Sequence, residues 1–329
     1  MDFPQSSYYK YNKTLLCLIG LWPYQGSFKK AIRYHTLNII LFTSILVQSK
    51  KIFRRDVTVQ IICKVLPFLV IIITLLLFKT LMNNQNDKFE DLWLRIKKDW
   101  AMERMEEEVK IKKAYAEEGQ YYTKILIYLA IVGQISLASV TPFASNIFDL
   151  LKPLNESRER MHLFDGDYIF IDEKQHFKIV TFYGQFVCSC GVLIGISLQS
   201  TFILFLQHIY GMFAALGFRL KNALSEVVTD TSNSGKMSRE EKHYRSILGC
   251  IKYHHYALEF ADIIEDYYSW PFVVTLGVSL LIIIPNLIQL SNFKILALLA
   301  LVVVSIFLFL VNCMGQKLID MSVIIAEET

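Results

Sequence analysis

The side chains best placed to act together chemically lie between positions 254 and 262. His254, His255, Glu259 and Asp262 are close in the chain, and His255 and Glu259 stand four residues apart. A helix would place that pair on one face, where they could share a metal ion. Ion pairing on a solvated helix face explains the same pattern more simply. We therefore favour ion pairing, and metal binding is the alternative.

The rest of the sequence holds no catalytic constellation. It has no Gly-x-Ser-x-Gly elbow, no Walker-type loop and no Cys-x-x-Cys pair. Cys188-Ser189-Cys190 falls within an apolar run, where packing is expected rather than redox chemistry. Lys64 is a cation inside another such run, about five residues from its outer end, so its long side chain can reach the headgroups; a ligand or ion role is the alternative. We expect neither an enzyme nor a cofactor or metal.

The composition is that of a helical membrane protein with several spans. Of the 329 residues 53% are apolar, and the net charge is only +4. The basic residues form no stripe with interleaved aromatic residues, so nucleic acid is not an expected partner. Stretches suited to crossing about 30 Å of hydrocarbon lie at 34–49, 59–82, 125–144, 179–218, 271–290 and 293–314. The first is the weakest, because Arg33 and His35 stand at its edge.

The run 179–218 could cross the bilayer once or twice. With one crossing and a cytoplasmic N-terminus, 23 of the 34 Lys and Arg residues lie on the cytoplasmic side. Two crossings make the split nearly even, so the positive-inside rule favours one. The sequence therefore predicts an all-α polytopic bundle of six spans, with the N-terminus in the cytoplasm and long cytoplasmic helical extensions.

This topology divides the chain into three parts, which are a cytoplasmic N-terminal segment (1–33), spans 1 to 4 (34–218), and a cytoplasmic helix with spans 5 and 6 and a C-terminal tail (219–329). The second part includes a cytoplasmic helical linker (83–122) and an extracellular loop (145–177). No internal repeat is visible, which argues against the inverted-repeat layout of many transporters.

The linker has a clear helical period. The apolar stripe consists of Phe89, Leu92, Trp93, Ile96 and Trp100, and the residues expected to face solvent are Arg95, Lys97, Lys98 and Asp99. A second cytoplasmic helix is expected from about residue 248 until Pro271.

Two N-glycosylation sequons test the same topology. Asn155-Glu156-Ser157 lies in the expected extracellular loop, whereas Asn12-Lys13-Thr14 lies in the cytoplasmic segment. We expect a glycan on Asn155 only.

Three stretches resemble the insect odorant receptor family. Leu18 to Pro23 is similar to its opening Leu-x-Gly-x-Trp-Pro, Leu248 to Phe260 to the helix that enters span 5, and Phe309 to Ser322 to its Phe-x-x-Cys-x-x-Gly-x-x-Leu-x-x-x-Ser signature. The resemblance implies an odorant-specific subunit of a ligand-gated cation channel. It also implies a shared odorant co-receptor as partner, a small volatile organic ligand, and a multi-pass position in the plasma membrane of olfactory sensory neurons.

The sequence departs from the family pattern twice. Cys313 stands one position late in the signature, with Asn312 where the family usually has Cys. The family also has a seventh span that lines the pore, and Ser322 to Thr329 resembles the segment that leads into it. We therefore expect an incomplete gene model, a splice form or a truncated chain, which would bind ligand or pack without conducting ions.

An apolar volatile needs a dry pocket with few polar groups. The outer halves of spans 2 to 5 could line one, and the candidates that combine outer depth with aromatic rings or small side chains are Phe68, Ser136, Ser139, Thr141, Phe143, Phe182, Tyr183, Phe186 and Val187. Helix packing and interfacial aromatic belts are the alternative explanation for the same residues. Gln185, Gln199 and Gln207 are expected to hydrogen-bond to neighbouring helices, and Pro67, Pro142 and Pro285 to kink theirs.

The resemblance also implies subunit packing by the last cytoplasmic region, for which the candidates are His254, His255, Phe309, Gly315 and Ser322. Two other classes of membrane protein are alternatives. A G-protein-coupled chemoreceptor would need an external N-terminus, seven spans and usually an external Cys pair. A six-helix transporter or membrane enzyme would show paired intramembrane charges or repeated broken helices. The charge bias and the pattern of spans favour neither.

Overall fold

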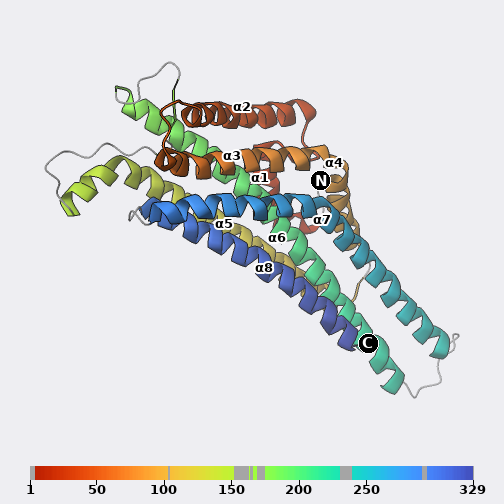
Figure 1. Ribbon diagram of the computed structural model, residues 1–329. Coiled ribbons are helices and arrows are strands. Elements are labelled where there is room, and N and C mark those ends of the chain that lie inside the picture. Colours follow the sequence, from red (N-terminus) through yellow and green to blue (C-terminus); the bar gives the residue numbers. More distant parts are fainter. Residues whose placement is uncertain are drawn as a thin grey trace.

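A computed structural model describes residues 4–102, 104–151, 163, 166–168, 175–229, 239–290 and 295–328. All regular structure in this part of the chain is helical (Figure 1). The helices are η1 (Pro4–Tyr9), α1 (Lys10–Ile19), α2 (Ser27–Ile52), α3 (Val59–Asn84), α4 (Asn86–Ala101), α5 (Glu106–Leu151), α6 (Phe177–Thr229), α7 (Arg239–Leu290) and α8 (Ile295–Glu328). The predicted all-α class is confirmed.

Three helices are much longer than a bilayer is thick. α5 has 46 residues, α6 has 53 and α7 has 52, which at about 1.5 Å per residue gives roughly 70 to 80 Å each. The apolar run 179–218 lies within α6 as one continuous helix, with no hairpin. α7 continues through Pro271, which therefore does not end the cytoplasmic helix as the sequence suggested.

Successive long helices run in opposite directions, so the expected outer ends gather at one end of the molecule. There, the amide of Gln289 near the end of α7 donates to the carbonyl oxygen of Cys63 near the start of α3, at 2.6 Å. Farther along the same pair, the hydroxyl of Tyr267 donates to the carbonyl oxygen of Met82 at 3.2 Å. Figure 1 shows α3 and α7 side by side. This arrangement is the one that repeated membrane crossing requires.

Within the described residues, four helices are long and apolar enough to cross a membrane: α3 and the described parts of α5, α6 and α7. The most apolar stretch of α6 is 61% buried inside the protein, whereas that of α5 is only 6% buried. α6 is therefore the central helix, and α5 turns most of its apolar surface outward. α2 is not one of the four, which agrees with the weakness of the first predicted span.

The predicted stripe of α4 forms the centre of the core. Phe89, Leu92, Trp93 and Ile96 are fully buried, and the Trp93 ring packs edge-on against Trp22 and Phe205 at centroid distances of 4.9 and 5.5 Å. This cluster ties the N-terminal segment and α4 to α6. The expectation that Asp99 faces solvent is wrong, because its side chain is completely buried. Asp99 follows Leu92 by seven residues and Ile96 by three, so it lies on the buried face of the helix.

Candidate functional site

The predicted ligand-pocket residues divide between two faces of α6. Val187 is 1% exposed, and the half-buried Tyr183 packs against the core from the same face. Phe182 and Phe186 lie on the adjacent stripe, with 75% and 46% of their surfaces exposed. The two residues of each pair are four positions apart and so share a face. The two pairs are offset by one residue, which an α-helix turns through about 100°. Of these four residues of α6, only Tyr183 and Val187 face the core.

The other predicted residues lie on α3 and α5. Phe68 of α3 is half-buried and packs against the same core as Tyr183 and Val187. Ser136 and Ser139 of α5 are exposed. Thr141 and Phe143 also belong to α5, but their side chains lie outside the described residues.

Tyr183 is held at the outer end of the bundle by polar and aromatic contacts. Its hydroxyl lies 3.0 Å from the hydroxyl of Thr43 on α2, and either group could be the donor. The ring of Tyr168, from the predicted extracellular loop, meets it edge-on at 5.9 Å between centroids. Neither Thr43 nor Tyr168 is indicated by the sequence, because Thr43 lies 140 residues from Tyr183 and Tyr168 lies in a loop without a helical period.

Ion pairs fasten this part of the loop to the end of α2. The carboxylate of Asp167 lies 3.0 Å from the Lys50 ammonium and 3.5 Å from the Arg54 guanidinium. The backbone N–H of Asp167 donates to the carbonyl oxygen of Val47 at 3.0 Å. Next to it, a Cβ on Gly166 would meet the Val47 side chain at 2.4 Å, so only glycine fits against α2. The loop therefore places Tyr168 over Tyr183 with little freedom.

A glutamine pair joins α5 and α6 within the apolar region. The amide of Gln185 donates to the side-chain oxygen of Gln134 at 2.7 Å. This confirms the expectation for Gln185. Among the described residues, the buried Nε2 of Gln199 and the buried Oε1 of Gln207 have no hydrogen-bond partner, so interhelical bonding is not found for those two.

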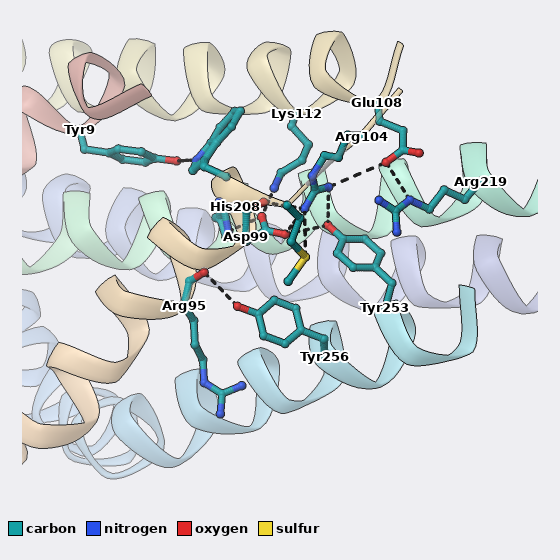
Figure 2. A network of polar contacts seen from close by, with 12 residues as sticks. Tyr9, Arg95, Asp99, Arg104, Glu108, Lys112, His208, Arg219, Tyr253 and Tyr256 are labelled. Carbon is teal, nitrogen blue, oxygen red and sulfur yellow. Dashed lines mark hydrogen bonds and ion pairs between the residues drawn. The ribbon is translucent and has the colours of Figure 1, made fainter. Parts of the chain in front are cut away.

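At the other end of the bundle, a buried polar network surrounds Asp99 (Figure 2). Its carboxylate contacts the guanidinium of Arg104 and the ammonium of Lys112. It also lies 3.0 Å from Nε2 of His208 and accepts a hydrogen bond of 3.1 Å from the hydroxyl of Tyr253. Burial raises the pKa of the Tyr253 phenol, so the hydroxyl stays protonated and can donate. One carboxylate of α4 thus gathers groups from the α4–α5 connection, α5, α6 and α7.

A second buried carboxylate extends the network. Glu108 accepts from Nε of Arg219 at 2.7 Å and lies 4.0 Å from Arg104. The guanidinium groups of Arg104 and Arg219 sit over the Tyr253 ring, at 5.0 and 4.4 Å from its centroid. Buried cations are tolerated only when carboxylates and π-faces replace their water. The network therefore holds four elements in one arrangement.

Residues 58–328 of the chain match the family model described as the 7tm odorant receptor. The chain belongs to the odorant receptor family. This match confirms the resemblance found in the sequence, and the match extends over most of the protein. No match was found among curated proteins.

Solved structures of odorant receptors share the fold. The insect olfactory receptor OR5 from Machilis hrabei in complex with eugenol is similar with a TM-score of 0.69 and 13% identity, over 94% of this chain and 78% of that chain. The structure of the same receptor described without eugenol gives a TM-score of 0.63 and 11% identity, over 92% and 76% of the two chains. At these identities the likeness concerns the fold.

The family signature on α8 packs partly against α6. The hydroxyl of Tyr210 donates to the carbonyl oxygen of Met314 at 2.6 Å, and the Lys317 ammonium lies 5.0 Å from the Tyr210 ring centroid. Cys313, the displaced signature cysteine, is exposed. In this odorant receptor the segment thus has one face on α6 and another that is open.

The residues predicted for subunit packing are mostly on open surfaces. His255 and Gly315 are exposed, and 67% of Phe309 is exposed. His254 is half-buried, with its ring 6.4 Å from that of Phe213; the side chain of Ser322 lies outside the described residues. Glu259 accepts from Arg95 at 2.9 Å, and no metal-binding group is found among the described residues. Glu259 therefore forms an ion pair, but its partner lies on α4 and not nearby on its own helix.

Proposed function

We propose that this chain is the odorant-specific subunit of a heteromeric ligand-gated cation channel in the plasma membrane of olfactory sensory neurons. Its partner is the shared odorant co-receptor, and its ligand is a small apolar volatile. Membership of the odorant receptor family supports the receptor role. Gating follows if the ligand binds one arrangement of the helices better than another.

The ligand pocket is proposed around Tyr183, on the outer part of α6. The observation that carries this choice is the combination found there. Tyr183 is a half-buried phenol that packs, like Phe68, against the core on the same face of α6 as Val187, with its hydroxyl next to Thr43 and its ring against that of Tyr168. An apolar wall with one or two hydroxyls is what a small volatile needs for orientation. The similar receptor from Machilis hrabei was solved with eugenol, a small aromatic molecule.

Replacing the pocket aromatics tests this location. We expect Tyr183→Ala and Phe143→Ala each to shift the odorant dose–response by about tenfold, because even a methylene-sized change in an apolar pocket is worth roughly 1 to 3 kcal/mol. The variants are made in the full-length receptor, and the readout is odorant-evoked current in cells that also express the co-receptor. Ile179→Ala is the control, since Ile179 lies on α6 with 54% of its surface exposed. Unchanged responses in both pocket variants would show that the pocket lies elsewhere.

The same recordings separate a channel subunit from a G-protein-coupled chemoreceptor. We expect the current to persist in excised patches without GTP, because a channel needs no soluble messenger. A current that disappears on excision and returns with GTP would favour the G-protein-coupled alternative.

The proposed orientation has its own test. With the N-terminus in the cytoplasm, Asn155 faces the lumen during synthesis and Asn12 does not. We expect glycosidase treatment to increase the gel mobility of the receptor, and Asn155→Gln to abolish that change while Asn12→Gln leaves it intact. A glycan on Asn12 would reverse the topology.

A further inference from the structure

One face of α2 carries a continuous stripe of exposed apolar side chains. Its members recur every three, four or seven residues and are Phe28, Ile32, Ile39, Phe42, Leu46 and Phe53, each about half exposed or more. From Phe28 to Phe53 the helix and its C-cap rise about 38 Å, which exceeds the roughly 30 Å of a hydrocarbon core. The ends of the stripe therefore extend into the headgroup layers.

Cations stand at the two ends of this stripe. Arg33 and Lys50 bound a stretch of 16 uncharged residues, which spans about 26 Å along the helix. Lys29 lies one turn before Arg33, and both are exposed. If the uncharged stretch occupies the hydrocarbon, Lys29 and Arg33 lie at the depth of the lipid phosphates.

A hydrogen bond to α1 holds Arg33 in place. The guanidinium of Arg33 donates to the carbonyl oxygen of Cys17 at 2.8 Å, which uses one of its five N–H donors. No Asp or Glu occurs between residues 3 and 55, and no ion pair joins Lys29 or Arg33 to a carboxylate of the described residues. The nearby Lys30 is different, because its ammonium bonds to the side chain of Asn86 at 2.7 Å.

We propose that Lys29 and Arg33 bind the phosphate of an anionic phospholipid, whose acyl chains lie along Ile39 and Phe42. Lys29 and Arg33 are one turn apart on the stripe immediately beside the apolar one. Ile39 and Phe42 follow them along α2 toward the bilayer centre. One lipid can therefore meet both stripes at once. Guanidinium and ammonium groups are the side chains that recognise phosphate oxygens. The site rests on α2 crossing the bilayer, but not on which end faces the cytoplasm.

Native mass spectrometry of the purified receptor tests the site, because it resolves individual bound lipids. The probes are phosphatidylserine and phosphatidylcholine of the same chain length. We expect the receptor to prefer phosphatidylserine, and Lys29→Gln with Arg33→Gln to reduce that preference about fivefold or more, since each cation near a lipid surface contributes about that factor. Lys97→Gln with Lys98→Gln is the matched control, because these lysines of α4 are also exposed and the change in charge is equal.

The outcomes separate clearly. Loss of preference in the first double variant and not in the second supports the site. Equal loss in both, or none in the first, overturns it. Failure would not affect the odorant recordings, which depend on the other end of the bundle, so the proposed function and this site can fail independently.

Discussion

Asp99→Asn is expected to destabilise the receptor by about 3 to 5 kcal/mol, the cost of removing one partner from a buried ion pair. The Asp99 side chain is 1% exposed and contacts both Arg104 and Lys112. Without its charge, two buried cations lose their nearest carboxylate while their water is still excluded. We expect a lower midpoint of thermal unfolding for purified receptor and fewer receptors at the cell surface.

Asp91→Asn provides the matched control on the same helix. Asp91 pairs with Arg95 at 2.9 Å, but its side chain is 41% exposed, and Arg95 keeps its second partner, Glu259. Exposed pairs of this kind contribute at most about 1 kcal/mol. Adding Lys112→Met to Asp99→Asn should recover part of the loss, because it removes one of the abandoned charges. If Asp99→Asn were no more harmful than Asp91→Asn, the network would not hold these helices together.

The sequence predicted the helices because their apolar residues recur with clear periods. The period that includes Phe89, Leu92, Trp93 and Ile96 correctly gave the buried face of α4. Position 99 falls on the same face by its spacing. Asp99 was nevertheless expected to face solvent, because burying a carboxylate alone is costly. Its partners come from four elements, and Tyr253 is 154 residues away. Such a network depends on how helices meet, which the local pattern of one helix does not contain.

For the proposed pocket, the sequence indicates the depth of a residue in the membrane but not the side of the helix on which it lies. Depth in the membrane follows from counting residues along a span, and this count pointed to the region of Tyr183. Which side of α6 faces the core depends on the neighbouring helices, so Phe182 and Tyr183, adjacent in sequence, fall on exposed and half-buried surfaces. Tyr168 lies over Tyr183 because Asp167 pairs with Lys50 and Arg54. Those partners lie more than a hundred residues earlier in the chain, and no periodicity indicates such a contact.

Gly20→Ala is the second substitution with a large expected effect. Gly20 ends α1 with φ of +73°, the left-handed conformation in which a side chain is strained. An added Cβ would also lie 2.7 Å from the carbonyl oxygen of Lys30 and 2.7 Å from the backbone nitrogen of Tyr34. These are backbone atoms of α2, so they cannot turn aside as a side chain would. We expect a loss of about 2 to 4 kcal/mol, which combines the strain of the left-handed residue with overpacking.

Gly26→Ala is the control six residues later. Gly26 has φ of −54°, and nothing lies within 4 Å of the position its Cβ would take, so the change should be nearly neutral. Thermal unfolding of the two purified variants measures the difference. Because Gly20 sets how closely α1 approaches α2, Gly20→Ala should also weaken the binding of phosphatidylserine at Lys29 and Arg33. Equal stability of the two variants would mean that α1 and α2 do not meet as closely as the structure shows.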